Sequence, residues 1–185
     1  YIDASMVGSM GAQASASIGL METTMWLLGS ICSAAAAGFY VQVSHQLGSN
    51  DPQRARNTLR QGIMSVLVVS ALIGLVSLAV SPFLPVWLGG GSDITPTASA
   101  YFAIVATALP IFQFSIFGAG MLRSSGNMVV PSIMSVVMMS LDVVFNFFLI
   151  FPTRPVQLFG AEVTVPGMGM GVVGAAIGTV SAELV

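Results

Sequence analysis

The chain has 185 residues, of which 55% are hydrophobic and only 6% are charged, with a formal net charge of −2. Average proteins carry about 25% charged residues, and a soluble domain needs them at its surface. Intrinsic disorder requires low hydrophobicity and high charge. The composition therefore excludes both a soluble globular domain and an intrinsically disordered chain. The five basic residues are arginines that form no stripe able to neutralise phosphates, so we expect no nucleic-acid partner. The remaining class is an integral membrane protein that contacts the lipid bilayer.

Four apolar stretches are long enough to cross a bilayer, whose core of about 30 Å requires roughly 20 residues of helix. They span residues 14–43, 63–88, 98–122 and 128–151. A fifth apolar helix is expected to begin near Met168, and residues 1–7 resemble the end of an earlier helix. Because the runs are continuous rather than alternating, they predict helices and not barrel strands. The predicted fold is an all-α polytopic transmembrane helix bundle, and we interpret the chain as a fragment of a longer protein.

Turn-forming residues separate these stretches. In the sequence Gly-Ser-Asn-Asp-Pro at residues 48–52, Asp51 can cap the next helix and Pro52 fits its first turn. Short loops are expected at residues 89–93 and 124–127, and a longer loop at residues 152–166. Two glycine pairs have the four-residue spacing that lets helices approach closely in lipid: Gly167 with Gly171, and Gly174 with Gly178.

The arginines indicate how the chain is oriented in the membrane. Arg54, Arg56, Arg60 and Arg123 fall in two connections on one predicted side, whereas the opposite side has only Arg154. Cytoplasmic loops carry an excess of basic residues, so the arginine-rich side is predicted to be cytoplasmic. We therefore expect a multi-pass protein of the cell's inner (plasma) membrane.

The most informative polar residue is Asp142, near the centre of the last long stretch, where inserting a carboxylate costs roughly 2.5–3.5 kcal/mol. Asn146 lies one turn later on the same helix face, and Met138 one turn earlier. Carboxylate and amide oxygens at this spacing could hold Na⁺, and a desolvated carboxylate could instead carry a proton. The alternative is a structural hydrogen bond between helices. We interpret Asp142 and Asn146 as a cation site and Met138 as a candidate cavity-lining residue.

Other polar residues leave more than one interpretation open. Glu22 could line the same cavity or pair with another helix, and Asp3 is a second buried carboxylate only if the first residues lie in the membrane. Cys32 is interpreted as a buried inert thiol and His45 as an interfacial imidazole. These residues give no nucleophile-and-base arrangement, and the phosphate-binding motif of ATPases is absent. We therefore predict that the protein is not an enzyme.

Five motifs, in order along the chain, resemble the N-terminal lobe of MATE (multidrug and toxic compound extrusion) transporters. They are residues 3–8 (Asp-Ala-Ser-Met-Val-Gly), 43–51 (Val-Ser-His-Gln-Leu-Gly-Ser-Asn-Asp), 122–127 (Leu-Arg-Ser-Ser-Gly-Asn), 141–151 and 171–179. The resemblance implies twelve helices in two six-helix lobes that work by alternating access. Residues 1–185 would then form part of the N-terminal lobe: the end of helix one, helices two to five and the start of helix six. The C-terminal lobe would be its partner.

The resemblance further implies a cation site formed by Asp3, Asp142, Asn146 and Thr179. The family places Asn before Asp on helix five, whereas this chain has the reverse order, so the choice between Na⁺ and H⁺ stays open. The implied function is secondary-active efflux of small organic, cationic or amphipathic substrates by Na⁺ or H⁺ antiport, with no cofactor beyond the coupling ion. The alternatives are a lipid-linked oligosaccharide flippase of the same superfamily and a membrane module that only assembles with partners.

Overall fold

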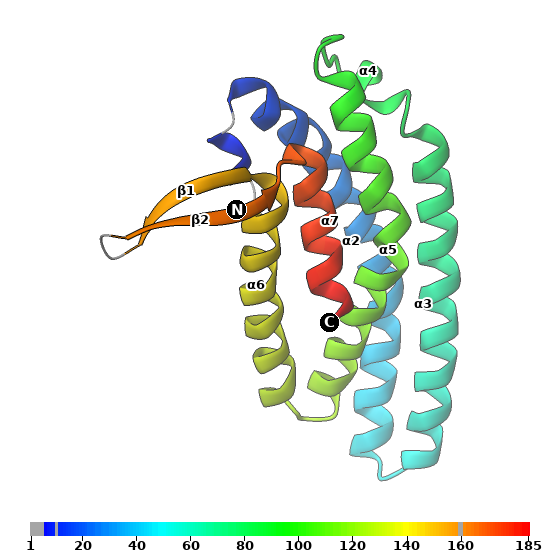
Figure 1. Ribbon diagram of the computed structural model, residues 1–185. Coiled ribbons are helices and arrows are strands. Elements are labelled where there is room, and N and C mark those ends of the chain that lie inside the picture. Colours follow the sequence, from blue (N-terminus) through cyan, green and yellow to red (C-terminus); the bar gives the residue numbers. More distant parts are fainter. Residues whose placement is uncertain (1–5, 10, 159–160) are drawn as a thin grey trace.

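The computed structural model describes residues 6–9, 11–158 and 161–185. Its elements follow one another as a helical bundle with one hairpin (Figure 1): α2 (Ala12–Gly48), α3 (Pro52–Val80), α4 (Leu84–Trp87), α5 (Thr95–Ser124), α6 (Val129–Ile150), β1 (Pro152–Leu158), β2 (Ala161–Met168) and α7 (Gly171–Leu184). At a rise of 1.5 Å per residue, even the 22 residues of α6 extend about 33 Å, enough to cross a bilayer core. The predicted all-α polytopic bundle is confirmed.

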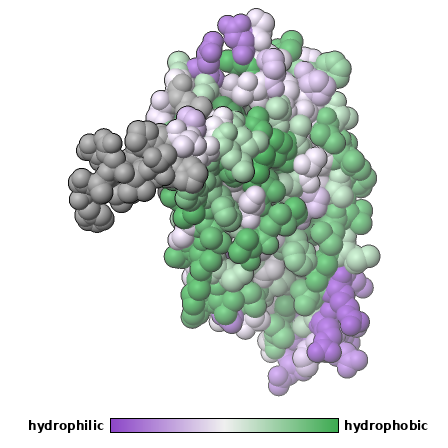
Figure 2. All heavy atoms as spheres, in the orientation of Figure 1, coloured by the Kyte–Doolittle hydropathy of each residue, from purple (hydrophilic) through white to green (hydrophobic). Residues whose placement is uncertain are grey.

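Four helices, α2, α3, α5 and α6, are long and apolar enough to span a membrane. Their outward-facing side chains are large and apolar, with Val68 55%, Leu75 64% and Val136 66% exposed. Figure 2 shows an apolar band across the molecule, with hydrophilic residues gathered near its two ends. Such a continuous apolar surface would be unstable in water but matches lipid tails. The protein is therefore a multi-pass membrane protein.

Helix α5 lies at the centre of the packing. It contacts α2, α3 and α7, and α7 in turn packs along α6, so that α7 lies between α5 and α6 (Figure 1). The consecutive helices α5 and α6 touch each other much less. Helix α7 therefore packs against both α5 and α6.

The second long helix begins at the start predicted from Asp51 and Pro52, but it ends earlier than the apolar run at residues 63–88 predicts. Helix α3 starts at Pro52, because the polar residues ahead of the run continue the same helix, and it stops at Val80. Pro82 and Pro85 follow, and proline lacks the N–H that helix propagation needs. Residues 84–87 form the separate turn α4.

The prediction of a loop at residues 152–166 is wrong. Strands β1 and β2 form an antiparallel pair in which Val156 lies opposite Val163 and Pro155 opposite Thr164. The segment is rich in valine and threonine, which favour the pleated conformation over a helix or an irregular loop. The hairpin extends from the bundle beside the end of α6 (Figure 1).

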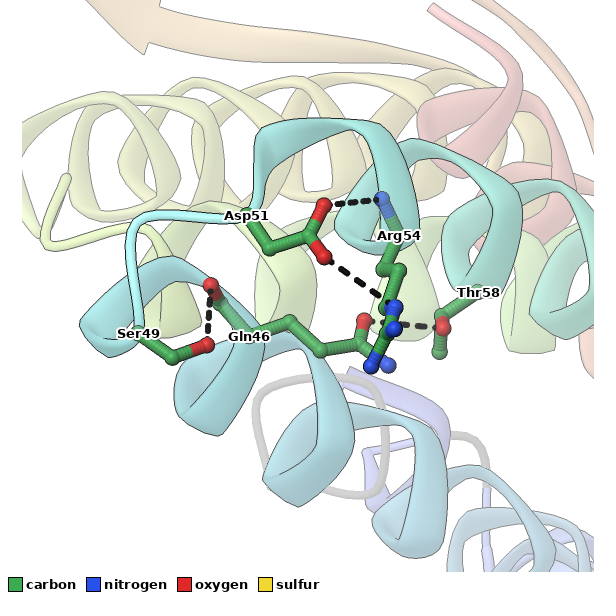
Figure 3. A network of polar contacts seen from close by, with 5 residues as sticks. All are labelled: Gln46, Ser49, Asp51, Arg54 and Thr58. Atoms are coloured by element: carbon green, nitrogen blue, oxygen red, sulfur yellow. Dashed lines mark hydrogen bonds and ion pairs between the residues drawn. The ribbon is translucent and has the colours of Figure 1, made fainter.

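Polar contacts fix the connection between α2 and α3 (Figure 3). The Asp51 side chain accepts a hydrogen bond from the Arg54 backbone N–H at 3.1 Å and pairs with the Arg54 guanidinium at 3.1 Å. The Thr58 hydroxyl donates to Gln46 Oε1 at 2.9 Å, and the Ser49 hydroxyl donates to the Gln46 carbonyl at 3.0 Å. The predicted cap by Asp51 with Pro52 in the first turn is confirmed.

We expect Asp51→Ala to reduce stability by about 1 kcal/mol, because the first turn of α3 loses its side-chain cap. Thermal unfolding of the purified protein in detergent measures this. Asp93→Ala is the matched control, since Asp93 lies in an exposed loop and should change stability by less than about 0.5 kcal/mol. Equal losses in the two variants would contradict the capping role.

Candidate functional site

The membrane-embedded polar pair lies on α6. Asp142 occupies the middle of the helix and is half-buried, and Asn146, one turn later, is fully buried at 0% exposure. Asn146 Nδ2 donates a hydrogen bond to Asp142 Oδ1 at 3.1 Å. The four-residue spacing places both side chains on one face of the helix, as predicted. The amide N–H thus stabilises a carboxylate that lies about half-way along a helix long enough to span the membrane.

Helix α7 covers this pair by close backbone packing. Gly174 lies against the Leu149 carbonyl, and Gly178 lies directly against the Asn146 side chain. A side chain at either glycine would overlap α6, so only glycine allows this approach. The predicted packing role of Gly174 and Gly178 is confirmed, and the contact explains why Asn146 is shielded from its surroundings.

Thr179, the next residue after Gly178, lines a pocket between α2, α5 and α7. The pocket has a volume of about 490 Å³ and is lined mostly by apolar and aromatic side chains, including Trp26, Tyr101 and Phe112. Glu22 of α2 lines the same pocket. No basic residue is among the pocket's lining residues, all of which belong to the described parts of α2, α5 and α7. The pocket therefore combines one carboxylate with aromatic faces, a combination that suits an organic cation.

Gln113 is a site residue that the sequence analysis missed. It lies in the middle of α5, is only 2% exposed, and lines the pocket. Within the described part of the chain, its Oε1 atom has no hydrogen-bond partner. A buried amide oxygen without a partner is costly, and such groups are usually explained by a ligand or by function. The available signal was an amide within an otherwise apolar run, three residues after Pro110.

The remaining predicted site residues are Thr179, Met138 and Asp3. Thr179 donates its hydroxyl hydrogen bond to the Ala175 carbonyl of its own helix at 3.1 Å. Met138 is half-buried on α6, while Met134, one turn earlier, lines a separate pocket of about 660 Å³ between α3, α5 and the end of α7. Asp3 lies outside the described residues. The cavity role of Met138 and the four-residue cation site therefore remain predictions.

Two single residues match their sequence interpretation. Cys32 is a buried free thiol, and His45 is exposed near the arginine-rich end of α2. Among the described residues, no three His, Cys, Asp or Glu side chains gather into a metal-binding cluster. A Na⁺ ion at Asp142 and Asn146 would thus need further oxygens from hydroxyl, amide or backbone groups.

These features define a helical membrane protein with a polar pair on α6 and an open, mostly apolar pocket between α2, α5 and α7. The MatE family model matches residues 1–148, and the chain belongs to this family.

Solved MATE structures have the same fold. The chain is similar to MATE in the bent conformation (20% identity, TM-score 0.86, covering 98% of this chain and 37% of that one). It is also similar to an inward-facing multidrug resistance MATE family transporter of the MOP superfamily (21%, TM-score 0.84, 98% and 38%). A third similar structure is a MOP superfamily transporter from Pyrococcus furiosus (22%, TM-score 0.82, 98% and 37%), described as having a binding pocket of reverse polarity that suggests a different function. The chain thus spans well under half the length of these proteins.

Proposed function

We propose that the protein containing this chain exports small organic cations in exchange for Na⁺ or H⁺ across the inner (plasma) membrane. The chain would provide most of the N-terminal lobe, and a C-terminal lobe would close the other side of the transport path. The observation that supports this proposal most is the 490 Å³ pocket, which has aromatic walls, a carboxylate at Glu22 and no basic lining residue. A transporter of this kind carries its substrate without chemical change, so we propose no enzymatic role.

The contacts of α7 suggest how ion and substrate could be coupled. Gly178 lies against Asn146, which is hydrogen-bonded to Asp142, whereas the adjacent Thr179 lines the substrate pocket. An ion or proton that binds at Asp142 would change the Asn146 contact and favour a different position of α7. Because Thr179 follows Gly178 directly, such a shift would reshape the pocket. A ligand shifts a conformational equilibrium only by its difference in affinity for the two states, so the ion would have to bind more tightly in one position of α7 than in the other.

The ion gradient would supply the energy for export. Moving one elementary charge through a membrane potential of 100 mV yields about 2.3 kcal/mol, to which a concentration gradient adds. The pocket itself argues against the flippase alternative, since a phosphate-bearing lipid-linked sugar would need basic side chains where Glu22 and aromatic residues lie. The alternative of a purely assembling membrane module is left to the transport measurement.

Transport by the full-length protein in sealed proteoliposomes tests the proposal. We expect ethidium to move against its gradient when an opposing Na⁺ or pH gradient is imposed, and to stop when the matching ionophore collapses that gradient. The controls are empty liposomes and proteoliposomes across which no Na⁺ or pH gradient is imposed. Ethidium movement that no ion gradient affects, or an absence of movement in well-folded protein, would contradict ion-coupled export.

We expect Gln113→Leu to weaken the binding of substrates that carry N–H donors, because Gln113 lines the pocket and its buried Oε1 has no hydrogen-bond partner among the described residues. Removing the acceptor should lower ethidium affinity about tenfold, while tetraphenylphosphonium, which has no donor, binds as before. The same change should raise thermal stability, since a buried amide oxygen is lost. Gln13→Leu on the exposed start of α2 is the matched control and should alter neither affinity. Equal weakening of both substrates would rule out Gln113 as a hydrogen-bond acceptor for them.

A further inference from the structure

The start of α3 presents a stripe of polar and basic side chains. Gln53, Arg56, Asn57 and Arg60 recur at the three- and four-residue spacing of one helix face and line a polar pocket of about 420 Å³. This pocket lies at one end of the bundle, next to the α2–α3 connection, where Figure 2 shows hydrophilic residues bordering the apolar band. That position corresponds to the headgroup region of a bilayer whose tails cover the band.

An apolar groove adjoins the polar pocket. The groove has a volume of about 450 Å³ and lies between the ends of α2, α3 and α5, with Leu47, Leu59 and Met121 among its lining residues. Arg56 and Pro52 line both the groove and the polar pocket. The two hollows therefore adjoin at Pro52 and Arg56, so that a polar pocket lies beside an apolar groove.

The basic side chains of this site are available for an anion. Asp51 is engaged by Arg54 through the ion pair and the helix cap shown in Figure 3. In the ranges that the structure describes, Arg56 and Arg60 are exposed and have no carboxylate partner. Two unpaired arginines one turn apart can hold a phosphate group between them.

We propose that this site binds an anionic phospholipid of the leaflet at the arginine-rich end, with its phosphate on Arg56 and Arg60 and an acyl chain in the groove. Basic pockets between transmembrane helices bind acidic headgroups, and each arginine near the surface raises the affinity about fivefold. A free phosphate would use the arginines but not the groove, and a zwitterionic lipid would fill the groove but gain less from the arginines. The proposal does not depend on which substrate the protein transports.

Native mass spectrometry of the full-length protein in detergent tests this site with two lipids, palmitoyl-oleoyl phosphatidylglycerol and palmitoyl-oleoyl phosphatidylcholine. We expect the wild type to retain phosphatidylglycerol preferentially. The double variant Arg56→Gln/Arg60→Gln should lose about thirtyfold in phosphatidylglycerol affinity. The matched control Arg54→Gln/Arg123→Gln removes the same charge at the same end of the bundle and should lose less than about threefold. All four arginines are exposed, so folding should be preserved in both variants.

A third variant tests the apolar part of the site. Gly118 lines the groove and also the 660 Å³ pocket, and a β-carbon added there would meet no neighbouring atom within 4 Å. Gly118→Leu should therefore fill the groove without disturbing the helices and reduce phosphatidylglycerol retention while Arg56 and Arg60 remain in place.

Four outcomes would overturn the proposal. Equal retention of the two lipids, or equal losses in the two double variants, would show non-specific electrostatics. Displacement of the lipid by millimolar inorganic phosphate, with no effect of Gly118→Leu, would indicate a site for a free anion. Absence of any retained lipid in folded wild-type protein would mean that a second copy or another segment covers the groove.

Discussion

Asp142→Asn should abolish ion coupling while substrate binding persists. The substitution keeps the shape of the side chain and leaves an amide oxygen that can still accept the hydrogen bond from Asn146 Nδ2, which lies at 3.1 Å from Asp142 Oδ1. It removes the charge that would hold Na⁺ or take up a proton in the middle of α6. We expect gradient-driven ethidium export to fall about a hundredfold, at the upper end of typical coupling energies. Tetraphenylphosphonium should still bind within about threefold of wild type.

The matched control for this variant is Asp93→Asn. It makes the same chemical change in an exposed loop, and its hydrogen bond from Ser92 is local. Export by this variant should equal that of the wild type. If Asp142→Asn retained gradient-driven export at the wild-type rate, Asp142 would have no part in the coupling. If it lost substrate binding and export together, the residue would belong to the substrate site instead.

The helices could be predicted from the sequence because lipid imposes a simple rule. A run of about 20 apolar residues must satisfy its backbone polar groups internally, and a helix does this. The ends were less predictable. The start of helix α3, eleven residues before its apolar run, was indicated by Asp51 and Pro52, but its end at Val80, ahead of Pro82, was not. The β1–β2 hairpin was missed because prolines at its start resembled loop residues.

The candidate site was likewise predictable only in part. The pairing of Asp142 with Asn146 follows from spacing alone, since residues four apart share a helix face. Glu22 was a candidate cavity-lining residue, but its sharing of a pocket with Thr179 and Gln113 could not be predicted, because it depends on how α2, α5 and α7 pack together. Sequence spacing within a helix says nothing about which other helix lies opposite. The resemblance to MATE transporters suggested the importance of Thr179, but only the packing shows that the adjacent Gly178 contacts Asn146.

Gly178→Ala should destabilise the contact between α6 and α7. The added methyl group would overlap the amide oxygen of Asn146, and overpacking of this kind costs about 1–3 kcal/mol. Thermal unfolding of the full-length protein in detergent measures the loss. Gly38→Ala is the matched control, because a side chain at this exposed helical position meets nothing within 4 Å. Alanine there should be neutral or stabilising by about 0.5–1 kcal/mol, since it favours the helix over glycine.

A double-mutant cycle separates this contact from a general preference for glycine. In an Asn146→Ala background the obstacle to the new methyl group is gone, so Gly178→Ala should cost less than in the wild type by most of its original effect. An unchanged cost would place the clash with another atom of α6 and remove the proposed path between the polar pair and the pocket. Because coupling would run through this one contact, Gly178→Ala should also weaken ion-driven export more than its loss of stability explains, whereas Gly38→Ala should leave export unchanged.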